Sequence, residues 1–385
     1  MNTETSVREP VATMVPEPGP ASIDPLDQLI AEEGLFALEP AQVTALRRQF
    51  LQRAAAWHLQ PGTAYAAYAA REGLRPGTRA TELPDALPLL PSMLFKRAGV
   101  HLAHPQASGI LWTTSSGTQG SVSRIPRDDT TLRRFFASIG NLSNEMLGIQ
   151  NSDLTVFNLG PDADEASNLW ISYVMAGITV MLPRSRYYVR DDRFHLEELL
   201  RDLQAAAGQR IAVMGPPPLL ADVAHAMRAR GLKLRVRPDS VLVTIGGWKR
   251  RSGERLLRQV FDELLSTAFD LEPTQVRDTF NMVELNSVLV ECAHHCLHVP
   301  PWLVVRARDP ATLRVLPTGK SGVLAYLDPT ARSYPGFVLS DDLGRVQVSL
   351  ACACGRCSDV LQIERRLNTV ESRGCALKMD AFGRT

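Results

Sequence analysis

The chain has 385 residues, of which 45% are hydrophobic and 22% are charged, and its 42 basic residues nearly balance 41 acidic ones. This composition is typical of a globular protein with two domains, or with one large domain and a sub-domain. A net charge of +1 gives no general attraction to nucleic acid or to anionic membranes. No apolar run reaches the length of a membrane span.

The N-terminal residues carry prolines and acidic side chains, and they lack the basic and apolar regions of a secretory signal. We expect a disordered leader over residues 1–24 and a cytoplasmic protein. Five of the six cysteines form two clusters, and Cys375 stands alone near the end. In a cytoplasmic chain, such clustering favours a metal site or reactive thiols over disulfides.

Helical periodicity dominates residues 25–73, and a proline-rich stretch with turns follows over residues 74–92. The apolar run Gly109–Trp112 then predicts a strand that leads into residues 113–121, a stretch of hydroxyl and glycine residues, and a helix is predicted from Asp128. Glycines let backbone N–H groups converge on an anion, and hydroxyls donate further hydrogen bonds. Residues 113–121 therefore fit a phosphate-binding loop, and composition alone fits a polar surface turn equally well.

Strands and helices alternate through the middle of the chain. Buried strands are predicted for residues 153–159, 179–182, 210–215 and 240–245, and helices for residues 168–176, 194–207, 219–230 and 253–265. This alternation indicates an α/β core with largely parallel strands, whose ligands collect at the carboxyl ends of the strands. The 113–121 loop, Gly215-Pro216 and Gly246-Gly247 all follow predicted strands, so we expect them to face one crevice.

The pattern changes after about residue 285. Short β-like runs over residues 302–307, 323–327, 337–339 and 345–350 predict a smaller, mainly β sub-domain. We expect a core over residues 25–285, the sub-domain over residues 286–365 and a tail over residues 366–385. Lys320 follows a glycine as in a Walker loop, but Arg314 stands where that motif needs glycine, so we interpret this segment as a turn.

In this order the segments resemble those of the adenylate-forming ligases, the superfamily of acyl-CoA synthetases and luciferases. Residues 114–120 are similar to its phosphate loop, residues 280–284 to its aromatic-Gly-x-Thr-Glu turn, and residues 340–344 to its Thr-Gly-Asp segment. Within the superfamily the chain most resembles the acyl-protein synthetases of the LuxE type, and next the phenylacetate-CoA ligases. The residues that carry this resemblance are Phe95-Lys96, 115–120, 215–217, 246–249, 291–292, 298–300, 341–344, 352–356 and 373–377.

The resemblance implies that a carboxylic acid, with a fatty or other apolar chain, reacts with ATP to give an acyl-adenylate, and that the acyl group then passes to a thiol. CoA, a carrier protein or an amine remain alternative acceptors. An inactive scaffold for a reductase or carrier partner is a further alternative, because Asn281 and Val283 depart from the motif. The chain also ends where relatives continue into a C-terminal domain with a catalytic lysine. Either Lys249 or Lys378 replaces that lysine, or adenylation relies on Mg²⁺ and the loop.

The resemblance also implies roles for single residues. The phosphates would be held by Ser115, Ser116, Gly117, Thr118, Gly120 and Ser121. Gly246 and Gly247 would approach the adenine, Asp342 (or Asp341) would bind the ribose, and Arg356 and Arg365 match arginines near the hinge. Glu284 would bind Mg²⁺, Lys249 would assist adenylation, and Cys375 would accept the acyl group.

Asn281 replaces a glycine, and because asparagine tolerates positive φ we expect its turn to persist. Thiolates and imidazole suit tetrahedral zinc, so the resemblance implies a structural zinc ion on Cys292, His298, Cys352 and Cys354, with His295, Cys296 and Cys357 as competing ligands. Walls of the acid pocket are predicted at Trp170, Tyr173, 214–218 and Trp248. For each of these residues an ordinary structural role stays open: a solvated charge, a turn or a buried hydrophobic thiol.

Overall fold

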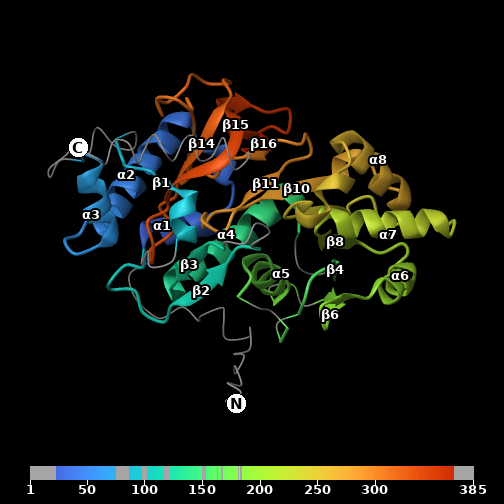
Figure 1. Ribbon diagram of the computed structural model, residues 1–385. Helices are drawn as coiled ribbons and strands as arrows, with labels where there is room; N and C mark the ends of the chain where they lie inside the picture. Colours follow the sequence, from blue (N-terminus) through green and yellow to red (C-terminus); the bar gives the residue numbers. More distant parts are fainter. Residues whose placement is uncertain are drawn as a thin grey trace, which may run out of the picture. The chain divides into compact units, whose positions relative to one another are not determined.

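The computed structural model describes residues 23–74, 86–97, 102–116, 122–149, 153–162, 164–165, 168–180, 182 and 184–367. The chain divides into two compact units (Figure 1). Unit 1 contains Leu147–Thr279, and unit 2 combines Ser22–Met146 with the chain from Phe280 onward. The sequence analysis joined residues 25–146 to residues 147–285 in one core. By their contacts, residues 25–146 belong instead to the unit that also contains the chain from Phe280 onward.

Unit 1 is built on a parallel sheet. Its strands run in the order β5 (Ser185–Tyr187), β4 (Thr155–Asn158), β8 (Ile211–Gly215), β9 (Val241–Ile245) and β10 (Val276–Phe280). β8 and β9 are buried along their whole length. This confirms the expectation of an α/β core with parallel strands, because strands covered on both faces must be apolar throughout.

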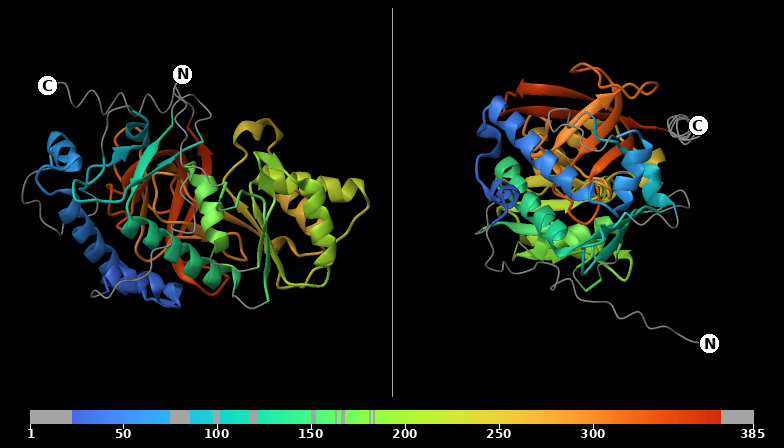
Figure 2. Two further views of the ribbon diagram at one scale, coloured as in Figure 1. Left: turned by 90° about the horizontal axis from the view of Figure 1, so that it is seen from below. Right: turned by 90° about the vertical axis from the view of Figure 1, so that its left-hand side faces the viewer.

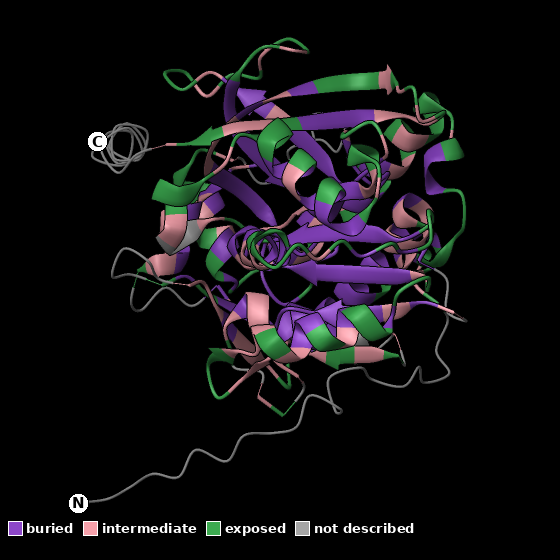
Figure 3. Ribbon diagram, turned by 90° about the vertical axis from the view of Figure 1, so that its right-hand side faces the viewer, coloured by how far each residue is buried: buried purple, intermediate pink, exposed green. Residues whose placement is uncertain are grey.

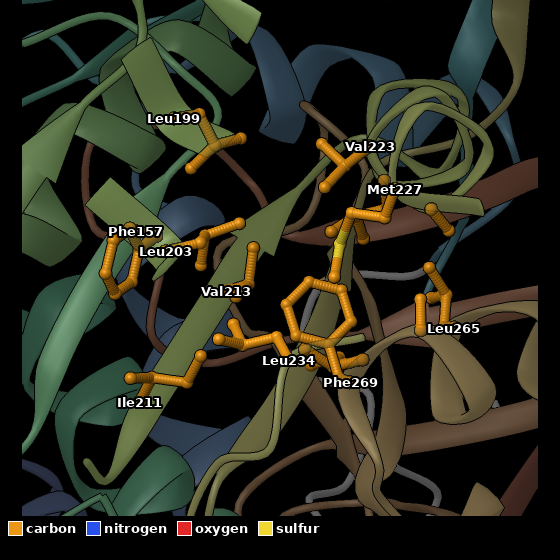
Figure 4. Packing of buried hydrophobic residues seen from close by; sticks show 14 of the residues in the cluster. Phe157, Leu199, Leu203, Ile211, Val213, Val223, Met227, Leu234, Leu265 and Phe269 are labelled. Atoms are coloured by element: carbon orange, nitrogen blue, oxygen red, sulfur yellow. The ribbon is translucent and has the colours of Figure 1, made fainter. Parts of the chain in front are cut away.

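The helices of unit 1 are α5 (Trp170–Val180), α6 (Leu196–Ala205), α7 (Pro217–Ala229) and α8 (Arg258–Phe269), with short 3₁₀ turns η5 (Lys249–Glu254) and η6 (Pro273–Gln275) and a small hairpin of β6 (Val189–Arg190) and β7 (Arg193–Phe194). Alternate residues of each strand serve two separate cores. Phe157, Ile211 and Val213 pack with leucines of α6 and with Met227 and Phe269 (Figure 4). Val156, Ala212 and Met214 instead pack with Met175 of α5. The central strands β8 and β9 are buried, whereas the helices keep exposed outer residues (Figure 3).

The strand predicted for residues 179–182 is wrong. Helix α5 continues to Val180, and the strand that pairs with β4 begins at Ser185. The apolar, β-branched run Ile178-Thr179-Val180 suits a buried helix end as well as a buried strand, so periodicity could not separate them.

Unit 2 contains an antiparallel sheet. Its strands run in the order β13 (Val304–Arg308), β14 (Gly322–Leu327), β15 (Phe337–Ala351), β16 (Cys357–Arg366), β12 (Leu297–His298) and β11 (Leu289–Glu291). A short strand, β1 (Leu90–Pro91), joins β15 in parallel. The runs predicted separately at 337–339 and 345–350 are one strand, because Asp341 and Asp342, which resemble turn residues, lie within the β15 ladder.

The helices of unit 2 are α1 (Pro25–Ala31), η2 (Leu35–Ala37), α2 (Pro40–His58), α3 (Ala64–Arg71), η4 (Ser92–Lys96) and α4 (Asp129–Leu147). Helix α2 is fixed to the β15–β16 hairpin by a buried ion pair of Arg47 with Asp359 at 2.6 Å, and the two lie together in Figure 2. Helix α4 starts one residue after the predicted Asp128, whose carboxylate accepts a hydrogen bond from the Thr131 N–H at 2.9 Å. Among the described residues, no helix is long and apolar enough to cross a membrane.

The predicted phosphate loop joins two antiparallel strands, β2 (Leu111–Thr114) and β3 (Arg124–Arg127). The loop therefore follows a strand outside the parallel sheet, since β2 and β3 pair only with each other among the described residues. That the loop and the two glycines face one crevice stays a prediction; Gly215 and Gly246 follow β8 and β9, which are neighbouring parallel strands. The sequence analysis missed β3, because Arg124-Ile125-Pro126-Arg127 lacks the alternation of a half-buried strand.

Candidate functional site

Two serines close the base of the β2–β3 loop. The Ser115 N–H donates to the Ser123 carbonyl at 3.1 Å, and the Ser123 N–H donates to Ser115 Oγ at 3.0 Å. Ser116 follows as a half-buried residue. The predicted phosphate ligands Gly117, Thr118, Gly120 and Ser121 lie outside the described residues. The described part of this loop thus ends in a pair of mutually bonded serines.

The same serine pair reaches Glu284. Ser123 Oγ donates to Glu284 Oε1 at 2.5 Å, and both side chains are buried. Burial raises the pKa of Glu284 above its ordinary value, and the hydrogen bond from Ser123 opposes that shift. The structure therefore brings the base of the predicted phosphate loop together with the predicted metal ligand. Sequence reasoning missed Ser123, which lies just beyond the motif.

Arg127 connects the β2–β3 hairpin to the segment that carries Glu284, and the sequence analysis gave it no role. Its side chain is fully buried, bonds Thr113 Oγ1 and donates to the Val283 carbonyl at 2.7 Å. The guanidinium carbon also lies 5.7 Å from the centre of the Tyr334 ring. One side chain thus ties both strands of the hairpin to the residue that precedes Glu284.

Asn281 closes its turn differently from the prediction. It does not have positive φ. Its side-chain amide donates to the carbonyls of Leu285 and Ser287, each at 2.9 Å. The turn persists because the amide bridges its two sides, and not because of left-handed backbone.

A group of charges surrounds Asp342 on β15. Asp342 pairs across the ladder with Arg366 of β16, and its neighbour Asp341 lies 3.8 Å from Lys96 Nζ and 3.7 Å from an Arg366 nitrogen. The pKa of Asp342 is raised to about 6, mainly by burial; Asp341 and Glu284 add to this rise, while Arg366 and Lys96 oppose it. The predicted metal ligand Glu284 and the predicted ribose ligand Asp342 therefore lie within electrostatic reach of each other.

The four predicted zinc ligands come together. One ligand atom from each of Cys292, His298, Cys352 and Cys354 lies within 4.8 Å of the others. The two sulfurs of Cys292 and Cys352 are 3.8 Å apart, and Cys354 Sγ is 3.4 Å from His298 Nε2. His298 Nδ1 bonds Ser358 Oγ at 2.7 Å, which leaves Nε2 facing the sulfurs.

Two of the three competing ligands, His295 and Cys357, are engaged elsewhere. His295 Nδ1 lies 3.3 Å from Glu291, and Cys357 Sγ contacts the Ser349 carbonyl at 3.6 Å. Cys296 lies beside the cluster, with its sulfur 3.5 Å from the His294 carbonyl. The described part of the chain thus offers one compact set of four ligands, and Cys296 borders it.

Arg356 lies next to this cluster. It follows Cys354 in the turn between β15 and β16, and its guanidinium donates to the Glu145 carbonyl of α4 at 2.5 Å. Its charge helps to lower the pKa of His298, although burial is the larger cause. Arg365, the other predicted hinge arginine, pairs with Leu343 in the β15–β16 ladder.

The remaining predicted residues belong to unit 1. Gly246 follows β9 with a φ of +83°, which favours glycine, and a Cβ on Gly247 would meet open space. Lys249 begins η5 directly after them. Of the predicted pocket walls, Trp170 and Tyr173 are buried with their rings stacked at 5.9 Å, whereas Trp248 packs edge-on against Phe261 of the core. Cys375 lies outside the described residues.

The fold is that of an adenylate-forming ligase, the class whose members activate an acid with ATP. The open conformation of 2-hydroxyisobutyryl-CoA ligase, in complex with 2-HIB-AMP and CoA, matches 88% of this chain and 77% of its own with a TM-score of 0.61 and 17% identity. The same ligase in its postadenylation state with 2-HIB-AMP gives a TM-score of 0.62 over 85% of this chain.

The sequence comparisons narrow the class. The family model "Acyl-protein synthetase, LuxE" matches residues 19–382. The long-chain-fatty-acid–luciferin-component ligase of Vibrio harveyi is 33% identical over 338 residues, 87% of each chain. The ligase of that name from Aliivibrio fischeri is 33% identical over 299 residues, 77% of this chain and 78% of its own. The chain belongs to the LuxE family of acyl-protein synthetases, and it is an ATP-dependent ligase that activates an acyl group and transfers it.

Proposed function

We propose that this ligase converts a long-chain fatty acid, or another apolar carboxylic acid, into an acyl-adenylate with MgATP and then passes the acyl group to a thiol. The observation that carries the proposal is the hydrogen bond of Ser123 to Glu284 at the base of the loop, within electrostatic reach of Asp342. The names of the relatives from Vibrio harveyi and Aliivibrio fischeri support a fatty substrate.

In this proposal, different residues of unit 2 bind the phosphates, the metal ion and the ribose of MgATP. Ser115, Ser116 and the loop that follows hold the phosphates, and the Glu284 carboxylate supplies an oxygen ligand of the kind that Mg²⁺ prefers. Asp342, with a pKa of about 6, is ionised above neutral pH and can accept hydrogen bonds from the ribose hydroxyls. When bound, Mg²⁺ would compensate charge on the phosphates.

We propose a structural zinc ion on the cluster of Cys292, His298, Cys352 and Cys354. Tetrahedral zinc with Zn–S bonds of about 2.3 Å and Zn–N bonds of about 2.0–2.1 Å separates two sulfurs by about 3.8 Å and a sulfur from a nitrogen by about 3.5 Å. The distances of 3.8 Å and 3.4 Å fit these values. Four protein ligands complete such a site, so its role is structural.

The acid panel is the main test. Pyrophosphate release is measured with MgATP and saturated acids of increasing chain length, aromatic acids and a no-acid control, with hydroxylamine to trap the adenylate. We expect release that rises with chain length and is lost in Glu284→Gln. Absence of release with every acid contradicts the proposal.

The acceptor needs a separate experiment. We propose Cys375 as the acylated thiol, and a radiolabelled acid with ATP should label wild type and Cys296→Ser but not Cys375→Ser. Equal labelling of the Cys375→Ser variant would exclude this residue. Release of pyrophosphate that depends on added CoA would favour the acyl-CoA alternative instead.

A further inference from the structure

Lys96 is the last residue of η4, a 3₁₀ turn that packs against β15 and β3, the strands beside the proposed nucleotide site. Strand β1 lies parallel to β15, with Leu90 opposite Val338 and Pro91 opposite Leu339, and η4 continues directly from it. The 3₁₀ turn contacts both β15 and β3. Its last residue, Lys96, lies near Asp341, on a turn that also packs against the strand that follows the phosphate loop.

The Lys96 ammonium forms a long ion pair with Asp341 and no hydrogen bond to it. Its Nζ lies 3.8 Å from Asp341 Oδ2, beyond hydrogen-bond distance, while Ser92 Oγ donates to that same oxygen at 2.9 Å. The Lys96 charge opposes the rise that burial causes in the pKa values of both Glu284 and Asp342, so the ammonium lies within electrostatic reach of both carboxylates. Its side chain is 27% exposed, so it remains open to a ligand.

Adenylation joins two anions at this site. A carboxylate oxygen of the acid forms a bond to the α-phosphorus, and the bond from that phosphorus to the bridging oxygen breaks. The carboxylate and ATP⁴⁻ become an acyl-adenylate with one negative charge and pyrophosphate with four, and no proton moves. Because Glu284, Asp341 and Asp342 already concentrate negative charge here, the step requires cations that meet the developing charge.

We propose that Lys96 is a catalytic residue of adenylation, whose ammonium contacts the α-phosphate as the acid attacks it. This inference rests on the proposed function. Arg366, the other cation near Asp341, is 63% exposed and opposes Asp342, the proposed ribose ligand, in the β15–β16 ladder. Lys96 approaches from η4, next to the strand that leaves the phosphate loop.

The chain has only five lysines, so every alternative can be tested. Lys233 and Lys320 are exposed, and Lys320 lies in the turn before β14, as the sequence predicted. They serve as matched controls. Lys249, the lysine assigned from the sequence, and Lys378 are the competing candidates, and neither side chain belongs to the described part of the structure.

The experiment measures pyrophosphate release with MgATP and the best acid of the panel for the five single Lys→Met variants and for Lys96→Arg. We expect Lys96→Met to lower kcat by about 10²- to 10³-fold, the loss typical of removing one transition-state donor, with a much smaller change in KM for ATP. Lys96→Arg should recover part of kcat, and Lys233→Met and Lys320→Met should match wild type.

The outcomes distinguish a failure of the proposed function from a failure of the inference about Lys96. Wild type inactive with every acid contradicts the proposed function, whereas active wild type with Lys96→Met within threefold of it overturns the inference alone. A loss confined to Lys249→Met or Lys378→Met overturns it as well. Thermal unfolding of each variant shows whether it folds. If Lys96 acted only by holding Asp341, then Asp341→Asn would lose as much kcat as Lys96→Met, and this result also contradicts the inference.

Discussion

Replacing Asp342 with asparagine should stabilise the free enzyme at alkaline pH. Burial raises the pKa of Asp342 from 3.8 to about 6, so the folded state favours the protonated carboxyl. The stability contributed by this group is complete below pH 3.8 and is lost as the pH rises through 6. At 1.36 kcal/mol per pH unit, the ionised carboxylate costs the folded state at most about 3 kcal/mol at pH 8.

Asparagine keeps the shape of the side chain and removes its charge. We expect the free energy of unfolding of Asp342→Asn to exceed that of wild type by about 1–3 kcal/mol at pH 8, where the lower value allows for partial exposure. The difference should fall to about half near pH 5 and almost vanish below pH 4. Urea unfolding of both proteins without nucleotide or Mg²⁺, at closely spaced pH values, measures this dependence.

The same substitution should weaken nucleotide binding. A charge-assisted hydrogen bond to the ribose contributes about 1.5–3 kcal/mol, so saturating MgATP should raise the stability of wild type more than that of Asp342→Asn. Asp341→Asn is the control, because it removes a neighbouring charge that lies next to Lys96 and Arg366. The reasoning is refuted if Asp342→Asn is less stable than wild type at pH 8 without nucleotide, or if the difference is independent of pH.

Three further predictions follow from single contacts. Arg127→Met should cost about 2–4 kcal/mol in urea unfolding because Thr113 and the Val283 carbonyl lose their buried donor, and a near-neutral result would contradict this role. Cys352→Ser should lower the zinc content, by elemental analysis, of protein purified without chelator, and metal-free wild type would refute the zinc site. Tyr326→Phe should stay within about 1 kcal/mol of wild type in urea unfolding, since its buried hydroxyl has no partner among the described residues, and a larger loss would show that it has one.

The parallel sheet of unit 1 could be predicted because its signals are local. Runs such as Ile211–Gly215 are continuous apolar segments bounded by glycine or proline, and a strand buried on both faces requires such a run. The grouping of the four proposed zinc ligands was also predictable, since the Cys-x-Cys spacing brings two thiols onto one tight turn and the family resemblance pointed to Cys292 and His298. Elements whose own residues form a recognisable local pattern can thus be predicted from the sequence.

The features that could not be predicted depend on contacts between residues that are not neighbours in the sequence. Nothing around Lys96 shows that β1 will join β15, almost 250 positions later, and only that pairing brings the ammonium to Asp341. Arg127 looks like a surface charge until Thr113, Val283 and Tyr334 surround it. The substitution at Asn281 suggested a backbone explanation, whereas the side-chain amide carries the turn.

The β15–β16 hairpin connects the cysteine cluster with Asp342, the proposed ribose ligand. Cys352 and Cys354 lie in its turn, and Asp342 faces Arg366 at its open end, about 30 Å away by the usual rise per residue. The pairing of the two strands shifts register at Leu343/Gly344 and between Gln347 and Leu350. A metal ion held by the four-ligand cluster would set which residues of β15 and β16 pair next to the turn. The opposition of Asp342 and Arg366 depends on the register of the same two strands. A slip of one residue in that register would turn every side chain to the other face of the sheet. The zinc site that we propose would thus act on the nucleotide site through strand register, without contacting it.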